Sequence, residues 1–198
     1  MTPMGKHTPP LEDLEKYLDS HLGNELRWTL RASTEWHVQS TLKLNIDGYQ
    51  VQVYAMDSVF LHARTLFEFF SKKTTNNYYG YDSFCIAKPK NLRYPGDWEN
   101  PLHANAMHAQ DRSQGSKLTS FDGKSKKDLN QMPVDFAKEI VRLWKEFINL
   151  LSKRDPILAK VAEEILKDAI SRANAVLNNE VTSKMAQQQK KNILKIEW

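Results

Sequence analysis

The chain has 198 residues, a formal net charge of +4, and 40% hydrophobic and 26% charged residues. This length and balance indicate a globular protein with one domain and a sizeable core. No apolar run approaches the ~20 residues that span a bilayer, and residues 1–10 lack the apolar stretch of a signal peptide. We therefore expect a cytoplasmic protein with no membrane partner. The single cysteine, Cys85, excludes an internal disulfide and a thiolate zinc site.

A short amphipathic helix is the first predicted element, after a flexible leader at residues 1–10. We expect this helix to end near Gly23, because glycine is the preferred residue just after a helix. Asn24 is suited to cap the next helix. The apolar stripe of the first helix is Leu11, Leu14, Leu18 and Leu22, and that of the second is Leu26, Leu30, Ser33 and His37.

Residues 42–53 change to an alternation of apolar and polar residues, the period of a strand. Asp47-Gly48 lies at the centre of this alternation and suits a type I′ turn. A two-residue turn there places Ile46 opposite Tyr49 and all the apolar side chains on one face. The sequence thus predicts a small β-hairpin over residues 42–53. A helix broken at Gly48 is the alternative.

Residues 56–70 show the clearest helical pattern in the chain. Two polar residues, His62 and Arg64, lie on opposite shoulders of the apolar stripe, where they are expected to face a cleft. Arg64 is four residues before Glu68, a spacing that favours an ion pair within the helix. The stripe is Met56, Val59, Phe60, Ala63, Leu66, Phe67 and Phe70.

The middle of the chain combines two long loops with a short helix. Residues 72–100 carry so many aromatic residues that we expect this loop to fold onto the body of the protein. A helix is predicted over Pro101–Arg112, since proline is accepted in a first turn. A polar, lysine-rich loop follows at residues 113–131. The aromatic residues of the first loop are Tyr78, Tyr79, Tyr81, Phe84, Tyr94 and Trp98.

Two further amphipathic helices are predicted, one opening at Pro133 and one covering residues 158–176, with Asp155-Pro156 between them. The resulting fold class is mainly α: an up-and-down helical bundle over residues 11–178 with the small hairpin attached. Residues 179–198 form a polar, lysine-rich tail. Its apolar patch, which we expect to dock on the body or on a partner chain, is Ile193, Leu194, Ile196 and Trp198.

Candidate catalytic residues gather in the segment after the aromatic loop. His103 and His108 supply proton-transferring groups, while Arg112, together with Arg64 of the earlier helix, supplies fixed positive charge. The five-residue spacing of the two histidines does not place them on one helical face, so we expect no metal and no cofactor. His62 is a candidate binding residue. This set suits metal-independent cleavage of a phosphodiester.

Lysine-rich segments are the candidate nucleic-acid contacts, because lysines neutralise phosphates. One lies between residues 117 and 127 and another in the tail. The first contains Lys117, Lys124, Lys126 and Lys127. Phe121 is the single aromatic residue among these lysines, so a solvated surface loop is the other interpretation.

Two sequence islands, HARTLFEFF at residues 62–70 and NPLHANAMHAQDR at residues 100–112, resemble small bacterial helical proteins of the HEPN-like class. Arg64 and Glu68 match the first motif, and Trp98, His108 and Arg112 match the second. His103 stands where that class has Asn or Arg. The resemblance implies a helical bundle, a homodimer with a cleft across its interface, and either RNA cleavage or binding of nucleotide or protein.

Three functions follow from these features. A non-catalytic interaction domain uses Arg64 and His108 as interior polar ties, and we favour this interpretation. An endoribonuclease of a stress or defence system uses His108 as general base, Arg64 and Arg112 to stabilise charge, and His103 as a second acid-base group. A nucleic-acid-binding adaptor works through the lysine-rich segments. The expected partners are RNA or nucleotide, a protein, and a second copy of the chain.

Overall fold

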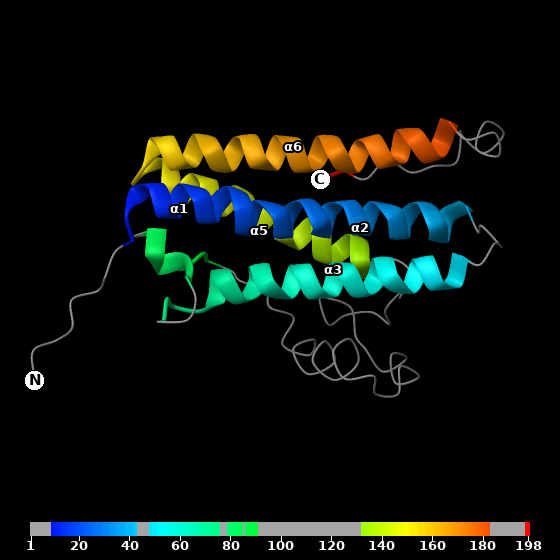
Figure 1. Cartoon of the computed structure of the whole chain (residues 1–198), viewed down its shortest axis with the longest axis horizontal. Coiled ribbons are helices and arrows are strands. Elements are labelled where there is room, and N and C mark those ends of the chain that lie inside the picture. Colours follow the sequence, from blue (N-terminus) through cyan, green and yellow to red (C-terminus); the bar gives the residue numbers. More distant parts are fainter. Residues whose placement is uncertain (1–8, 43–47, 76–78, 85, 91–131, 183–196) are drawn as a thin grey trace, which may run out of the picture.

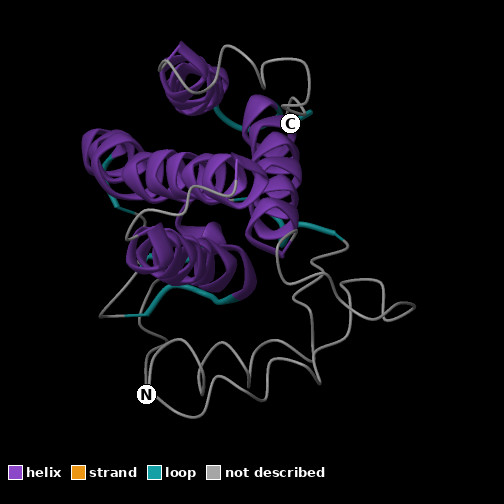
Figure 2. Cartoon of the chain, turned by 90° about the vertical axis from the view of Figure 1, so that its right-hand side faces the viewer, coloured by secondary structure: helices purple, strands orange, loops and turns teal. Residues whose placement is uncertain are grey.

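Helices make up most of the described part of the chain, and no β-strand is found there (Figures 1 and 2). The computed structural model describes residues 9–42, 48–75, 79–84, 86–90, 132–182 and 197–198. Its first helical rod joins α1 (Leu11–Tyr17), the π-helical turn η1 (Leu18–Leu22) and α2 (Gly23–Leu42). The other elements are α3 (Gly48–Ser71), the 3₁₀ turn η2 (Tyr81–Phe84), α5 (Met132–Ser152) and α6 (Pro156–Thr182). The predicted mainly α bundle is confirmed at this level.

The core forms where the apolar stripes of the four rods meet. The stripe predicted over residues 56–70 is confirmed, since its members from Val59 to Phe70 are buried and Met56 packs against them. Phe147 of α5 contacts aromatic rings of α3, η2 and its own helix at edge-to-face angles. Edge-to-face packing is the favoured geometry for such rings. Its partners are Phe69, Phe70, Phe84 and Trp144.

The order of helix directions differs from the predicted up-and-down bundle. Phe60 contacts Phe136 at 5.3 Å between ring centroids, and Phe70 contacts Phe147 at 5.8 Å. Residue numbers therefore increase in the same direction along α3 and α5, so these two helices run parallel. An up-and-down order needs short connections. The connection from residue 72 to residue 131 is long enough to return along the bundle before α5 begins.

α2 occupies the centre of the arrangement, between α3 and α6, with α5 behind it (Figure 1). Tyr17 contacts Phe69, and Trp28 contacts His62, so α3 runs antiparallel to the α1–α2 rod. Gly23 approaches Ile165 of α6, and four residues later Arg27 bonds to Asp168. α2 and α6 therefore run in the same direction. The outer face of α2 lies between two flanking helices.

Gly23 does not end a helix, contrary to the sequence prediction. It has helical dihedral angles (φ −63°, ψ −39°), and the rod continues through it from the π-helical turn into α2. A Cβ atom at this position would lie 3.1 Å from Ile165 Cγ2 and 3.1 Å from Leu18 O. The glycine thus permits close packing of α6 and of the π-helical turn, a use of glycine that a local pattern does not reveal.

The predicted β-hairpin over residues 42–53 is wrong for its second strand, because residues 48–53 begin α3. Residues 43–47 lie outside the described residues. Two periods coexist in this sequence. Positions 49, 53, 56, 60, 63, 67 and 70 are all apolar and are spaced by four and three, which is the helical repeat. The longer, helical pattern determines the structure here. The start of α3 at Gly48 agrees with the alternative prediction of a helix broken at that residue.

The aromatic loop folds onto the bundle where the structure describes it, as predicted. Tyr81 and Phe84 are buried, and Tyr79 contacts Tyr17. Trp198 at the end of the tail also packs against the core. α6 extends to Thr182, beyond the boundary expected at residue 178. The predicted helix at residues 101–112 and the predicted loop at residues 113–131 lie outside the described residues.

Asp155 explains the sharp turn between α5 and α6. Its Oδ1 accepts hydrogen bonds from the backbone N–H groups of Ile157 and Leu158, at 3.0 and 3.1 Å. These are N–H groups of the first helical turn that have no partner within the helix, so Asp155 caps α6. The break predicted at Asp155-Pro156 is confirmed.

Candidate interaction surface on α2, α3 and α6

Trp28 is a large aromatic side chain on the outer face of α2. It is 47% exposed, although its neighbours Leu26 and Leu30 on the same helix are fully buried. At 100° per residue, position 28 points away from the stripe that contains positions 26 and 30. A half-exposed tryptophan with core material beneath it is a typical anchor for binding. Trp28 is therefore the centre of the candidate site.

On the α3 side, Trp28 contacts His62, one member of a half-buried pair of polar residues. The Nδ1 atom of His62 lies 2.8 Å from Glu25 Oε2, and both side chains are mostly buried. The imidazole ring lies 4.8 Å from the Trp28 ring between centroids, tilted by 45°. Glu25 thus fixes the orientation of His62, and His62 supports one side of the indole. The binding role expected of His62 becomes a supporting one in this arrangement.

Tyr17 lies near this pair but is not suited to proton transfer. Burial raises the pKa of the Tyr17 hydroxyl to about 12, and the charge of Glu25 adds to the shift. The ring is enclosed by aromatic neighbours, His21 and Tyr79 among them. The hydroxyl consequently stays protonated throughout the physiological range, and Tyr17 acts as a packing residue.

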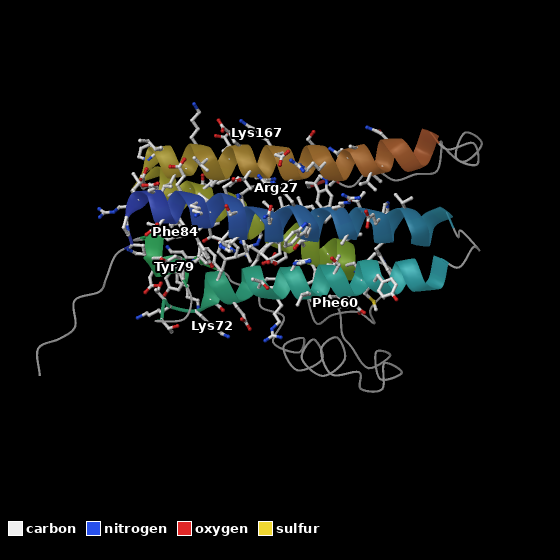
Figure 3. The ribbon with its side chains drawn as sticks, in the orientation of Figure 1. Arg27, Phe60, Lys72, Tyr79, Phe84 and Lys167 are labelled. Atoms are coloured by element: carbon white, nitrogen blue, oxygen red, sulfur yellow. The ribbon has the colours of Figure 1, made fainter. Side chains whose placement is uncertain are left out.

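On the α6 side, Arg27 forms a network that joins α2, η1 and α6 (Figure 3). Its Nε donates to Asp168 Oδ2 at 2.7 Å, and its Nη2 donates to Asp19 Oδ1 at 3.1 Å. Its Nη1 donates to Asn24 Oδ1 and to the Asp19 carbonyl. Every guanidinium nitrogen of Arg27 has a partner, and the side chain is only 19% exposed. Arg27 therefore ties the helices together.

The charges of this network stabilise one another. Burial works against the charge of Arg27, but its hydrogen bonds with Asp168 and Asp19 outweigh burial and raise the pKa of the guanidinium. The hydrogen bond from Arg172, followed by the one from Arg27, lowers the pKa of the Asp168 carboxyl group. Both groups remain ionised at neutral pH.

Arg31 and Arg172 differ from Arg27 because, in the described ranges, each forms hydrogen bonds through its Nε atom alone. Arg31 Nε donates to Glu35 at 2.9 Å, and Arg172 Nε donates to Asp168 at 2.8 and 3.0 Å. Among the described residues, neither arginine has a partner for its Nη atoms. The two side chains are 64% and 65% exposed. Each therefore presents two outward donor groups, the arrangement that binds a carboxylate or phosphate in a bidentate manner.

A groove between α2 and α6 brings these donors together with Trp28. Its volume is about 320 Å³, at the lower end of the size of small-ligand sites, which begins near ~300 Å³. We call it the α2–α6 groove. Apolar atoms come from Trp28 on one helix and from the Ala175–Val176 pair on the other. The remaining lining residues are Asn24, Arg27, Arg31 and Arg172.

The catalytic set predicted from the sequence is described only in part. Arg64 is half-buried on α3, and its Nε donates to Glu68 Oε1 at 3.2 Å, which confirms the predicted pair. His62 bonds to α2 instead, so the two residues do not face a common partner. The other predicted site residues lie outside the described residues: His103, His108, Arg112, Lys117, Lys124, Lys126 and Lys127.

Sequence reasoning missed the α2–α6 groove. Trp28 gave a usable signal, since it is a bulky aromatic residue on the polar side of a predicted helix. The approach of α2 to α6 gave none, because 141 positions separate Arg27 and Asp168 in the chain and their contact arises only from the packing of the two helices. Long-range pairs of this kind cannot be derived from spacing.

Comparison with protein-family models, curated proteins and solved structures found no match for this chain. Within the described ranges, no helix has the length and apolar content needed to cross a membrane. The described residues also contain no group of three or more His, Cys, Asp or Glu placed to hold a metal ion.

Proposed function

We propose that the protein is a non-catalytic, HEPN-like helical interaction domain that works in the cytoplasm of a prokaryote. The observation that supports this most is the bond between His62 of α3 and Glu25 of α2. His62 is a candidate binding residue in the sequence, and this bond engages it within the bundle. Here the imidazole is enclosed between a carboxylate and an indole, and its contacts join two helices.

Arg64 fits the same interpretation. Its Nε bonds to Glu68 one turn later, and Lys72 Nζ approaches the same carboxylate at 3.3 Å. Such a cluster on one helix balances the charge of a half-buried guanidinium, which otherwise carries a desolvation cost. The interaction-domain hypothesis expects Arg64 to have a hydrogen-bond partner in the protein, and Glu68 supplies one. The α2–α6 groove supplies a surface for the interaction itself.

The discriminating experiment is an RNA cleavage assay. End-labelled RNA is incubated with the wild-type chain in the presence of EDTA, next to His108→Ala and Arg64→Lys. We expect no cleavage above that of buffer for all three proteins. Cleavage by the wild type that is lost in His108→Ala, with an unchanged unfolding transition, would show that the domain is a ribonuclease.

The structural role of His62 is tested by a double-mutant cycle with Glu25→Gln and His62→Gln. The two half-buried groups should show a coupling free energy of about 0.5–1 kcal/mol in denaturant unfolding. A coupling near zero would mean that the pair does not tie α2 to α3.

A further inference from the structure

Two arginines whose Nη groups have no partner among the described residues lie on either side of the α2–α6 groove, one on each helix. Arg27, which lines the same groove, provides the contrast: its three nitrogens are all bonded within the bundle. Within the part of the chain that the structure describes, Arg31 and Arg172 bond only through Nε. The hydrogen bond from Nε fixes one edge of each guanidinium group against a carboxylate. Orientation by a fixed carboxylate lowers the entropy that an arginine loses on binding a ligand.

We infer that the α2–α6 groove binds an acidic peptide segment of a partner protein, with carboxylates on Arg31 and Arg172 and an apolar side chain on Trp28. This inference rests on the proposed function, since it names the partner of the interaction domain. The ligand is a peptide in which carboxylates flank an apolar residue.

The acids beside the three arginines leave the groove close to neutral. Each arginine already has an acidic neighbour: Glu35 beside Arg31, and Asp168 beside Arg172. Asp19 lies against the third arginine, Arg27. These acids offset much of the positive charge, so net charge does not select between a carboxylate and a phosphate: attraction to the arginines and repulsion by the acids both grow with the charge of the ligand. The apolar atoms of Trp28, Ala175 and Val176 favour a peptide, whose apolar side chain they can contact. The Nη donors remain directional and match the planar geometry of a carboxylate.

The apolar part of the groove is where we expect the apolar residue in the middle of the peptide to bind. The Trp28 ring is held by His62 on one side and lines the groove, where Ala175 and Val176 of α6 complete the apolar surface. Tryptophan and arginine are the residue types most enriched among those that dominate binding energy at protein interfaces. The volume of about 320 Å³ suits a short segment and not a broad protein face.

The test is a titration of the full-length protein, labelled with ¹⁵N, with the acetylated and amidated peptide Glu-Leu-Glu. Its control is the uncharged peptide Gln-Leu-Gln. We expect Glu-Leu-Glu to shift the Trp28 indole N–H and the Nε–H signals of Arg31 and Arg172, and Gln-Leu-Gln to leave them unchanged. Inorganic phosphate and AMP, run in parallel, should bind more weakly than Glu-Leu-Glu.

Single substitutions test whether the peptide binds in the α2–α6 groove. Arg31→Gln and Arg172→Gln should each weaken binding about two- to fivefold, as expected for exposed ion pairs. Trp28→Leu, which keeps an apolar side chain, should weaken it less than Trp28→Ala does. Arg154→Gln is the matched control, because Arg154 is exposed in the turn between α5 and α6, away from the groove.

Three results would overturn the inference: equal binding by wild type and the two arginine variants, equal binding of the two peptides, or tighter binding of phosphate or AMP. None of these outcomes depends on the RNA cleavage assay. RNA cleavage with intact peptide binding would remove the proposed non-catalytic function and leave the groove assignment standing. Absence of both would leave the non-catalytic proposal and remove this inference.

Discussion

Replacing Arg27 by methionine tests whether the guanidinium network joins α2 to α6. Methionine keeps an unbranched stem of similar length and removes all the donors. The change takes away the bond to Asp168 at 2.7 Å and the bond to Asp19 at 3.1 Å. Asp168 keeps Arg172 as a partner, so no buried charge is left alone. The loss is therefore that of the bonds themselves.

The expected magnitude follows from the exposure of each partner. A hydrogen bond to a partly buried charged group contributes about 1.5 kcal/mol, and the pair with the exposed Asp19 about 0.5 kcal/mol. The total is about 2 kcal/mol. For a chain of this size it corresponds to a fall in Tm of about 4–8 °C.

The assay is urea unfolding of the wild type, Arg27→Met and Arg31→Met, followed by circular dichroism. Arg31 is the internal comparison because it makes one exposed pair within α2, whose loss costs at most about 0.5 kcal/mol. Equal destabilisation by the two substitutions would refute the argument that Arg27 ties two helices together.

The stability difference between the wild type and Arg27→Met should depend on pH. The folded state holds the pKa of Asp168 below its ordinary value of 3.8, chiefly through Arg172 and then through Arg27. A lowered carboxyl pKa contributes stability above the unfolded pKa, and that contribution is lost as the pH falls through the folded pKa. The difference in free energy of unfolding between the wild type and Arg27→Met should therefore have its full value at pH 6 and become smaller below pH 3.8. A difference that widened in acid would contradict the assigned network.

Two further substitutions probe the core and the folded loop. Phe147→Ala removes a fully buried ring that contacts four aromatic residues, and should cost about 3–5 kcal/mol in urea unfolding; a cost below ~1 kcal/mol would contradict the described packing. Gly80→Ala places a Cβ 2.2 Å from Lys72 O, a backbone atom that cannot turn aside. We expect about 1–3 kcal/mol of destabilisation, and an unchanged Tm would show that the loop does not approach α3 as described.

The helices with long apolar stripes could be predicted from the sequence. Residues 56–70 carry a repeat with few competing signals, and the Asp155-Pro156 break has a local chemical cause. The hairpin failed because six alternating residues and an Asp-Gly pair satisfy a strand, while the same residues also continue a longer helical repeat. The helix is favoured over the hairpin because the helical repeat is longer, and each added turn extends the apolar stripe of α3.

Features that depend on neighbouring helices could not be predicted. Gly23 has the residue type of a helix end, but the approach of Ile165 is what requires a glycine there. The parallel course of α3 and α5 depends on a long connection whose path no pattern fixes. The α2–α6 groove likewise arises from packing, with Arg31 and Arg172 on helices far apart in the chain.

The central claim is that Arg31 and Arg172 present open donor groups while those of Arg27 are occupied. Titration of the ¹⁵N-labelled protein with sodium acetate, at an ionic strength held constant with sodium chloride, tests this in one experiment. The Nε–H signals of Arg31 and Arg172 should move with acetate, and that of Arg27 should stay in place. Equal movement of all three, or movement of Arg27 alone, would contradict the account.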